Sequence, residues 1–559
     1  MSIESLIARA KERQALRIAA AEGTTKAKVQ ESKPAISALM HSLGLAAPVA
    51  NQESEAQESA YTLGAFTYNQ KQKEFISLGS QRNSCVLIGA AGTGKTTAQS
   101  GFVQALIDSG SCGFIQTDDH KYLNKGTPGI VICAFTRRAI RNIRKRMPVA
   151  LQSNCMTIHK LLEYKREFEQ VVDPQTGDFK TIKVFRPARN SFNPLPSDIS
   201  CVIFEEASMI GVPLFDQYKD ALCHPVQEIF LGDLNQIPPV MGRAILGYKL
   251  NELPVVELDQ VYRQALESPI ISFAHKILAG VPLKKEEIKD LSRPGFSAQF
   301  WGKKTYPENA IDQVGSHLCK LFDAGIYDPE EDVILTPQNV GFGTIELNKH
   351  LANHMARKRQ AVTFEIIAGF MKLYLSEGDR VLYEKEEAIV KSIRYNLSYH
   401  GVRPQSESDS LSYWGHKLVQ DVKSAEELSE DELFESMANF NPHEDRVNKA
   451  SHIVTLQLLE SDEEVTIETA AELNAIEFSY CMTVHKAQGS EWRKVWFITH
   501  HSQSRMWSRE LLYTAVTRAK EELNLLVEAN TFEKGIINQR IQGKTWQEKA
   551  MSFMDSSMA

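Results

Sequence analysis

The chain has 559 residues, which exceeds what one hydrophobic core supports and indicates three or four domains. Hydrophobic residues make up 43% of the chain and charged residues 24%, and no apolar run approaches the roughly 18 residues that cross a bilayer, so we expect no membrane-spanning helix. The formal net charge of −7 excludes a uniformly basic protein, but it leaves room for a local basic channel that binds nucleic acid.

The N-terminal region, residues 1–60, is predicted to hold a basic helix over 3–22 followed by a polar tether rich in Ala, Ser, Gln and Glu. Two interpretations stay open, a solvated tail and a helix that docks on a protein partner. No signal peptide pattern is present, and the eight scattered cysteines contain no CxxC pair. We therefore expect reduced thiols, no zinc site and a cytoplasmic protein.

A glycine-rich turn dominates the first folded part of the chain. The apolar run 85–88 predicts a buried strand. The stretch from Gly89 to Thr96 matches GxxxxGK[ST], and helical spacing continues to residue 107. Strand, glycine turn and helix in this order predict a loop whose backbone N–H groups bind phosphates, with Lys95 at the β- and γ-phosphates and the Thr96 hydroxyl on Mg²⁺. We expect a nucleoside triphosphate to contact Gly89, Gly92, Thr93, Gly94, Lys95, Thr96 and Thr97.

Polar residues before and after this loop extend the predicted site. The Gln70 amide, about 20 residues upstream, can pair with an adenine edge because it both donates and accepts hydrogen bonds. A later buried strand ends in Glu205 and Glu206, where one carboxylate can hold Mg²⁺ and the other can orient the attacking water. A further strand leads through Asp233 to Gln236. Parallel α/β sheets bind ligands at the carboxyl ends of their strands, which is where these groups lie.

Two interruptions of the α/β rhythm predict insertions. Alternating runs on either side of the turn 173–178 predict a β-hairpin within about 165–190, which either projects from the body or shields a sheet edge. Short antiparallel strands are expected within 376–476, as a small β-barrel-like module with a polar excursion. The predicted division is a first domain over 61–265 and a second built from 266–375 and 477–559.

The order of these motifs resembles that of the superfamily 1 helicases. The forms TIH (157–159), GDxxQxPPV (232–240), YRQ (262–264), VHKAQGSE (484–491) and LYTAVTRA (512–519) are most similar to the RecD/Dda-like branch. The resemblance covers about residues 65–530 and leaves the N-terminal 60 residues outside. One departure concerns the metal site, because this branch usually has Asp-Glu where this chain has Glu205-Glu206.

The resemblance implies an α/β fold with two RecA-like domains that sandwich ATP and Mg²⁺, a hairpin in the first domain and an SH3-like barrel in the second. The implied activity is that of an ATP-dependent DNA helicase that moves 5′→3′ on single-stranded DNA in replication, repair or recombination, in a bacterial or phage-infected cytosol. The hairpin strands 168–184 lie where this branch carries its strand-separating pin.

Residue roles carried over from the branch fall into four groups. The implied catalytic residues are Lys95, Glu206, Gln236, Arg263 and Arg518, the last two as arginine fingers. The nucleotide would also touch Gln70, Tyr262, Gly489 and Glu491, and Mg²⁺ would bind Thr96 and Glu205. The implied contacts to DNA are Thr136, Thr157, His159, Thr336, Asn339, Thr483 and His485.

Three other functions stay open from the sequence. An RNA-directed helicase would differ in its contacts to the 2′-hydroxyl, which sequence does not reveal. A non-unwinding ATP switch and the motor subunit of a nuclease complex are the remaining alternatives. No nuclease-like carboxylate cluster accompanies the motifs, so we expect any nuclease to be a separate chain.

Overall fold

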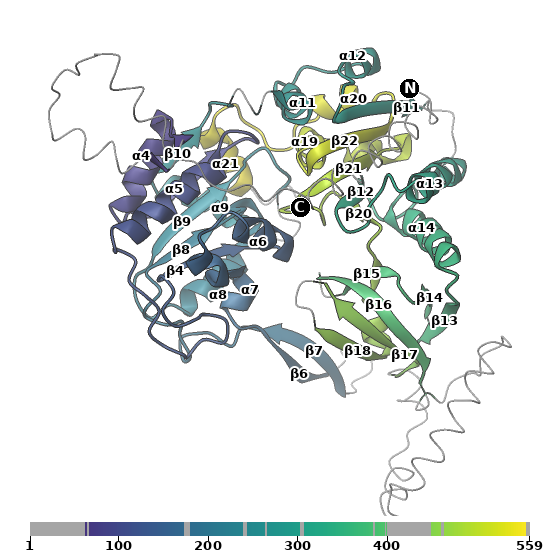
Figure 1. The fold of residues 1–559 in the computed structure, drawn as a ribbon, viewed down its shortest axis with the longest axis horizontal. Coiled ribbons are helices and arrows are strands. Elements are labelled where there is room, and N and C mark those ends of the chain that lie inside the picture. Colours follow the sequence, from purple (N-terminus) through teal and green to yellow (C-terminus); the bar gives the residue numbers. More distant parts are fainter. Residues whose placement is uncertain are drawn as a thin grey trace, which may run out of the picture.

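Two lobes, each built on a parallel sheet, form the body of the protein (Figure 1). The structure is a computed structural model, and it describes residues 62–63, 66–172, 179–238, 243–262, 265, 267–301, 307–369, 371–383, 386–396, 399, 449–459 and 463–554. The predicted N-terminal helix and tether, the hairpin turn 173–178, the polar excursion of the insert and Arg263 lie outside the described residues. None of the described helices is both long and apolar enough to cross a membrane.

The first lobe contains a six-stranded sheet in which every neighbouring pair is parallel. Its strands in spatial order are β10 (Val255–Leu258), β3 (Cys85–Gly89), β9 (Gln227–Gly232), β8 (Cys201–Phe204), β4 (Ile130–Ala134) and β5 (Cys155–Thr157). Its main helices are α4 (Gln70–Ser80), α5 (Lys95–Asp108), α6 (Arg137–Arg144), α7 (Ile158–Leu161), α8 (Val212–Asp220) and α9 (Ile245–Glu252). Alternate residues of β3 enter two different cores, with Val86 on one face and Leu87 on the other, so the apolar strands are buried on both sides as predicted.

The second lobe repeats this plan with five parallel strands. In spatial order they are β11 (Phe296–Trp301), β22 (Ala519–Glu528), β21 (Trp492–Ile498), β12 (Asp332–Thr336) and β20 (Cys481–Thr483). The helices around this sheet include α11 (Pro269–Leu278), α12 (Lys285–Asp290), α13 (Pro307–Asp323), α14 (Thr344–Arg359), α19 (Arg509–Val516) and α20 (Thr531–Ile537). Two buried clusters again cover opposite faces of the sheet, so the α/β prediction is confirmed for both halves of the chain.

The insert in the second lobe is a curled antiparallel sheet with its own buried core. Its strands are β13 (Thr363–Ala368), β14 (Met371–Ser376), β15 (Arg380–Tyr383), β16 (Glu386–Tyr395), β17 (Lys449–Leu458), β18 (Glu464–Thr469) and β19 (Glu477–Phe478). Helix α18 (Ala470–Asn474) connects β18 to β19. The sheet begins at Thr363, earlier than the expected boundary at 376, because β13 pairs with β14 over six residues.

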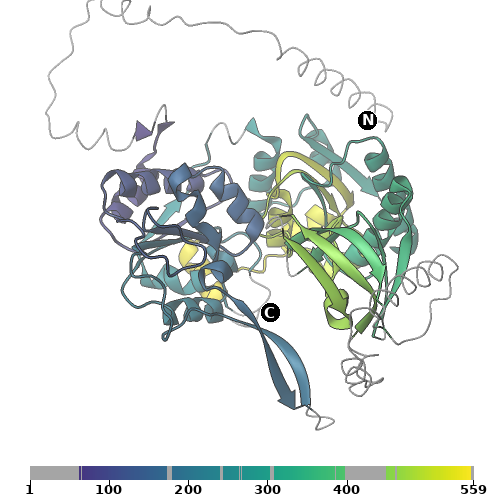
Figure 2. The same ribbon diagram turned by 60° about the horizontal axis from the view of Figure 1, so that its bottom comes forward.

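The predicted hairpin is present in the first lobe. Strand β6 (Lys165–Val172) pairs antiparallel with β7 (Phe179–Arg186) in eight residue pairs, from Lys165↔Arg186 to Val172↔Phe179. In both views the ribbon leaves the body of the lobe as a separate arm (Figures 1 and 2). Because these two strands pair only with each other among the described strands, the hairpin is a projection and does not continue the main sheet.

The C-terminal helix corrects one predicted boundary. We expected 477–559 to belong wholly to the second lobe, but α21 (Trp546–Met554) packs against α9, and Ala550 and Phe553 join a first-lobe core. Gly247 permits this packing, since a Cβ there would lie 2.9 Å from the Phe553 Cβ. The end of the chain therefore crosses back and joins the two lobes a second time.

Candidate nucleotide and nucleic-acid site

The glycine-rich loop has the backbone shape that its sequence predicts. Gly92 and Gly94 have φ of 81° and 85°, in the left-handed region that glycine adopts without strain. A Cβ at Gly94 would lie 2.6 Å from the Gln72 Nε2, so this position also needs glycine for space. Lys95 opens helix α5, and its Nζ donates to the carbonyl oxygens of Gly89 at 2.6 Å and Ala90 at 3.2 Å. The loop is thus a small cradle at a helix N-terminus with one ammonium group folded over it.

A glutamine that the sequence did not single out, Gln72, reaches this loop, and the adenine contact of Gln70 stays a prediction. Gln70 is exposed at the first position of α4, whereas Gln72 is buried and its Nε2 donates to the Gly94 carbonyl at 3.1 Å. The Gln72 Oε1 accepts from the Tyr262 hydroxyl at 2.5 Å, and the Tyr262 amide donates to the Gly92 carbonyl at 3.3 Å. Asn69 caps α4 in a capping box with Gln72, which turns the third helical residue inward. That box was the available sequence signal for Gln72.

The two consecutive glutamates follow strand β8 directly. Glu206 has φ 50° and ψ 44°, a left-handed conformation that is unusual for a residue with a side chain and is typical of functional sites. Burial, with the neighbouring Glu206 charge, raises the pKa of Glu205 to about 7, against an opposing effect of Lys95. Burial also raises the pKa of Glu206, and the charges of Arg518 and Lys95 oppose that rise. Glu206 therefore lies within the electrostatic field of a cation from each lobe.

Gln236 and Arg518 are the other described members of the predicted catalytic set. Gln236 is 5% exposed, and its Oε1 is a buried acceptor without a hydrogen-bond donor among the described residues. Arg518 is 2% exposed, and among the described residues it donates to neutral oxygens of its own lobe, namely the carbonyls of Thr514 and Ser490 at 3.0 Å each and the Thr517 hydroxyl at 3.2 Å. The Gln236 oxygen can therefore accept a hydrogen bond from a bound water, and the Arg518 guanidinium can donate to a bound anion.

Tyr513 joins the lobes at the phosphate loop, a role that sequence reasoning missed. Its hydroxyl donates to the Asp233 carboxylate at 2.7 Å and accepts from the Ala91 amide at 2.7 Å. His275 of α11 donates from Nε2 to the Ala91 carbonyl at 2.9 Å. Both backbone polar groups of one loop residue are thus bound by side chains of the second lobe. Tyr513 stands inside the LYTAVTRA motif, so its position was visible, but its partners were not.

We expect Tyr513→Phe to lower the free energy of unfolding by about 1–3 kcal/mol, because it leaves the partly buried Ala91 amide and part of the buried Asp233 carboxylate without a partner. Chemical denaturation of the nucleotide-free protein measures this change. Tyr248→Phe is the matched control, since the Tyr248 hydroxyl accepts from Arg243 near the surface of a single lobe. An equal loss in the two variants would contradict a special role of the contact between the lobes.

Polar side chains follow the carboxyl ends of strands in both lobes. The hydroxyls of Thr136, Thr157 and Thr483 each accept from a backbone amide at the start of the next turn, at 3.2 to 3.3 Å. Thr136 also donates to the Gly489 carbonyl of the second lobe at 3.3 Å. These three threonines share the strand-end position, and in each lobe neighbouring strands run in the same direction, so the groups line one edge of each sheet.

The remaining predicted nucleic-acid contacts divide into surface and core positions. His159 is half-buried between the rings of Phe135 and Tyr164, with centroids at 5.8 and 4.9 Å, and Asn339 is exposed. His485 is half-buried, and burial together with the Arg540 charge lowers its pKa. Thr336 corrects the prediction, because its side chain at the end of β12 is fully buried and its hydroxyl accepts from Gln503 at 2.9 Å.

Gly489 and Glu491 lie where the lobes meet. Gly489 has φ 71°, and a Cβ there would lie 2.9 Å from the Met209 sulfur of the first lobe. The Glu491 carbonyl accepts from Arg138 Nε at 3.3 Å, and its carboxylate lies 3.5 Å from the Lys520 Nζ. The Glu491 charge contributes to the raised pKa of Glu206, so the Glu491 carboxylate also acts electrostatically on the cleft.

The C-terminal segment forms one wall beside the phosphate loop. A cavity of about 220 Å³ is lined by Gly89, Ala90 and Thr93 of the loop and by Lys544, Trp546 and Lys549 of the C-terminal segment, among other residues. The Lys549 Nζ donates to the Asn235 side chain at 2.5 Å, within the run that connects Asp233 to Gln236. The sequence did not predict this contact, because nothing in the C-terminal pattern indicates which lobe the last helix covers.

The sequence matches two described families. Residues 72–242 match the family "AAA domain", and residues 478–526 match "UvrD-like helicase C-terminal domain". An ATP-dependent RecD2 DNA helicase of Deinococcus radiodurans is 26% identical over 461 residues, which cover 81% of this chain and 48% of the relative. A RecBCD enzyme subunit RecD of Buchnera aphidicola is 23% identical over 490 residues, covering 83% and 74% of the two chains. This chain thus spans about half the length of the RecD2 protein.

Solved structures of Pif1 helicases also resemble the chain. A crystal structure of Bacteroides Pif1 bound to single-stranded DNA has 14% sequence identity and a TM-score of 0.39, over 84% of this chain and 93% of the other. A Pif1 helicase from Bacteroides in complex with ADP-AlF3 and single-stranded DNA has 14% identity and a TM-score of 0.41, over 84% and 95%.

Proposed function

We propose that this chain, which belongs to the RecD-like branch of the superfamily 1 helicases, hydrolyses ATP between its two lobes and uses the change of lobe spacing to move along DNA and unwind it. The observation that carries the proposal is the position of Glu206. Its carboxylate interacts electrostatically with Lys95 of the first lobe and Arg518 of the second. An ATPase site that needs both lobes is a site whose chemistry depends on their spacing.

The residues of the cleft suit phosphoryl transfer. The backbone amides of the glycine-rich loop and the Lys95 ammonium would receive the β- and γ-phosphates, and Glu206 would orient the attacking water with help from the Gln236 amide. Arg518 donates to neutral carbonyls, so exchanging them for γ-phosphate oxygens would give stronger, charge-assisted hydrogen bonds. By the family pattern Arg263 would be a second such arginine, and Tyr262 would lie beside the nucleotide.

The donor set also suits Mg²⁺. The Thr96 hydroxyl in the first turn of α5 and the Glu205 carboxylate at the end of β8 are hard oxygen ligands, and Mg²⁺ commonly takes few protein ligands besides phosphate and water. The bound ion would supply positive charge against the phosphates. The Glu205 side chain is one methylene longer than the aspartate usual in this branch, which would favour contact to the ion through water.

We expect the Mg²⁺ requirement of the ATPase to depend on pH through Glu205, because its pKa is raised to about 7 and only the carboxylate binds the ion. Below that pKa the apparent Mg²⁺ affinity should fall by up to about tenfold per pH unit, and above it the affinity should level off. Titration of ATPase rates with Mg²⁺ at several pH values measures this effect.

Glu205→Gln supplies the control for this pH dependence. The variant should keep the pH dependence that ATP itself contributes and lose the part that Glu205 adds. Glu205→Asp, which restores the residue usual in the branch, should retain Mg²⁺ binding. If wild type and Glu205→Gln gave the same pH profile, Glu205 would not be a metal ligand.

Single-stranded DNA would lie along the strand ends of both lobes. Hydroxyls and imidazoles suit contacts to the phosphate backbone that do not depend on sequence. We propose Thr136, Thr157 and His159 in the first lobe and Asn339, Thr483 and His485 in the second. Thr336 is left out because its side chain is 0% exposed and its hydroxyl already accepts from Gln503. Thr136 also binds the Gly489 carbonyl, so a change of lobe spacing would alter both that contact and the grip on DNA.

Three finer points complete the proposal. The lobes on the two parallel sheets would be RecA-like domains near 61–265 and 266–375 with 477–559, except that α21 belongs with the first by its packing. The curled antiparallel sheet would be an SH3-like barrel, and the β6–β7 hairpin would be the pin that separates the strands of duplex DNA. Translocation would run 5′→3′.

The ATPase rate with oligo-dT and with oligo-U of equal length tests the substrate class. We expect strong stimulation by oligo-dT. Stronger stimulation by oligo-U than by oligo-dT would replace the DNA proposal with an RNA-directed helicase, since the two polymers differ mainly in the 2′-hydroxyl and one methyl group. Activity that neither polymer stimulates would favour an ATP switch.

A further inference from the structure

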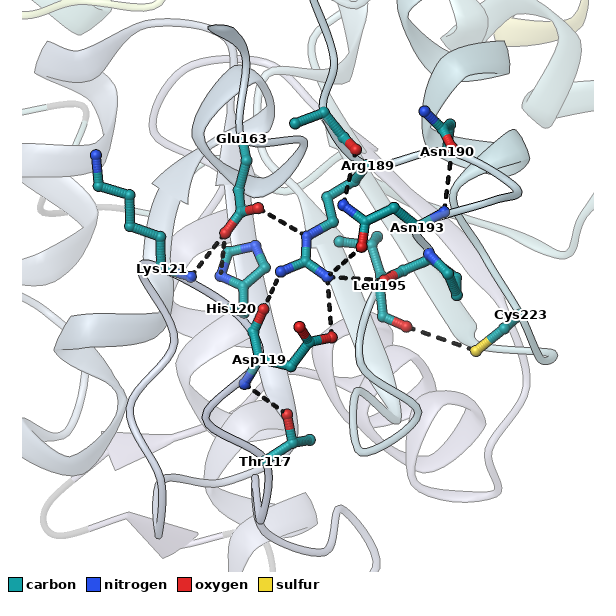
Figure 3. Close-up of polar contacts among 12 residues, drawn as sticks. Thr117, Asp119, His120, Lys121, Glu163, Arg189, Asn190, Asn193, Leu195 and Cys223 are labelled. Atoms are coloured by element: carbon teal, nitrogen blue, oxygen red, sulfur yellow. Dashed lines mark hydrogen bonds and ion pairs between the residues drawn. The ribbon is translucent and has the colours of Figure 1, made fainter.

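Arg189 is a buried cation at the base of the hairpin (Figure 3). It is 2% exposed, and its Nε donates to the Glu163 carboxylate at 2.8 Å. Its Nη1 donates to the Asp119 carboxylate at 3.1 Å and the Pro194 carbonyl at 3.0 Å, while Nη2 donates to the Asp119 carbonyl. Burial works against this charge, but the hydrogen bonds of Glu163 and Asp119 raise the pKa of Arg189 above its usual value. These charge-assisted hydrogen bonds hold the buried Arg189 guanidinium in one position.

The Glu163–Arg189 pair connects the two stems of the hairpin. Glu163 lies just before β6 and Arg189 just after β7. The backbone adds to the connection, because the Leu162 carbonyl accepts from the amides of Ala188 at 3.1 Å and Arg189 at 3.2 Å. Glu163 has φ 46°, a left-handed conformation that turns the chain out of α7 into the hairpin.

Asp119 and His120 connect these stems to the body of the first lobe. Both residues lie in the connection between α5 and β4, and the Lys121 amide next to them donates to the other Glu163 oxygen at 2.7 Å. The His120 Nδ1 accepts from the Tyr122 amide at 3.2 Å, so Nε2 carries the proton and donates to the Leu161 carbonyl at 2.9 Å. The hairpin base is therefore held by the lobe from two directions.

The same base touches a predicted DNA contact. Tyr164, the residue before β6, donates its amide to the His159 carbonyl at 3.0 Å and packs its ring against the His159 ring at 4.9 Å. The Tyr164 hydroxyl donates to Gln217 of α8. The direction of the hairpin is thus set within a few residues of His159, a predicted DNA contact.

A projecting arm needs a rigid base to act on duplex DNA. At about 3.3 Å per residue, the eight residues of β6 span roughly 26 Å. A rotation of about 10° at the base would move the far end by roughly 4–5 Å, more than the rise of about 3.4 Å between base pairs. A loose base would let the arm yield to the duplex.

We propose that Arg189, through Glu163 and Asp119, is a positioning residue that fixes the hairpin against the first lobe, so that movement along DNA is converted into strand separation. The proposal rests on the proposed helicase function and adds a residue set outside the ATP cleft. It requires that Arg189 affect unwinding without affecting the hydrolysis of ATP on single-stranded DNA.

The test compares two rates in Arg189→Lys and Asp119→Asn, the rate of duplex unwinding and the rate of ATP hydrolysis on single-stranded DNA. Lysine keeps the charge but cannot reproduce the forked hydrogen bonds, so the base pairs unwound per ATP hydrolysed should fall about tenfold. Hydrolysis should stay within about twofold of wild type, because no group of the network lies in the ATP cleft. Asp119→Asn is the second variant because the Asp119 side chain is exposed, so this protein should fold even if Arg189→Lys does not. It should give a smaller loss of unwinding per ATP.

Asp118→Asn is the matched control, since this neighbouring carboxylate is exposed and pairs with Lys125 at 3.8 Å. It should unwind like wild type. The proposal is overturned if Arg189→Lys and Asp119→Asn unwind like wild type, or if unwinding and hydrolysis fall together in both. A wild-type protein that hydrolyses ATP on single-stranded DNA but never unwinds would instead overturn the proposed function, so the two failures are distinguishable.

Discussion

Replacing Lys95 with alanine is expected to lower the rate of ATP hydrolysis by about 10²- to 10³-fold, the range seen when one preorganised donor is removed from a transition-state site. The Lys95 ammonium binds only the Gly89 and Ala90 carbonyls in the described structure and packs into no core. The variant should therefore keep the melting temperature of wild type within a few degrees. Steady-state phosphate release and thermal unfolding measure the two quantities.

Lys71→Ala is the control for this experiment. Lys71 lies on the neighbouring helix α4, is about half exposed, and pairs at 3.1 Å with Glu74 on the same helix. Such a surface pair contributes little, so neither hydrolysis nor stability should change. If Lys95→Ala still hydrolysed ATP at the wild-type rate, the glycine-rich loop would not be the catalytic phosphate site.

Arg518→Lys is expected to lower hydrolysis by about 10³-fold or more, as removal of an arginine finger does, while ATP binding is largely retained. The Arg518 charge reaches Glu206 from the second lobe, and the shorter, single-point ammonium of lysine cannot replace a forked guanidinium there. Hydrolysis rates and the affinity for a fluorescent ATP analogue separate the two effects.

Arg509→Lys provides a matched variant in the same lobe, because Arg509 opens helix α19 and Arg518 follows the end of that helix. Arg509 donates to the Ile536 carbonyl at 2.9 Å and to Gln539 at 2.8 Å, entirely within the second lobe. It should leave hydrolysis close to wild type. Equal losses in Arg518→Lys and Arg509→Lys would mean that the effect comes from damage to the lobe, and the arginine-finger role would be withdrawn.

The parts of the fold that follow from local pattern were predictable from the sequence. Buried parallel strands appear as short apolar runs, and their polar ends mark the ligand edge, so the positions of Lys95 and Glu206 followed directly. The hairpin followed from alternation on either side of a turn. These signals depend on neighbours in sequence, which a single sequence displays.

The contacts that were missed depend on which surfaces meet. Tyr513 and His275 bind the phosphate loop from the other lobe, and α21 crosses to α9, and neither arrangement leaves a periodic signal. The contact of Gln72 was not predicted, because a capping box, and not a motif position, turns its amide toward the loop. Thr336 was assigned to DNA by its place at a strand end, but its side chain is fully buried and its hydroxyl accepts from Gln503.

The central claim is that ATP hydrolysis between the lobes drives strand separation. Strand displacement by the wild-type chain on duplexes with a 5′ or a 3′ single-stranded DNA tail tests it most directly. Displacement that requires ATP and occurs on the 5′-tailed duplex, with little on the 3′-tailed one, is the predicted result. Vigorous ATP hydrolysis on the same DNA, with neither duplex opened, would contradict the claim.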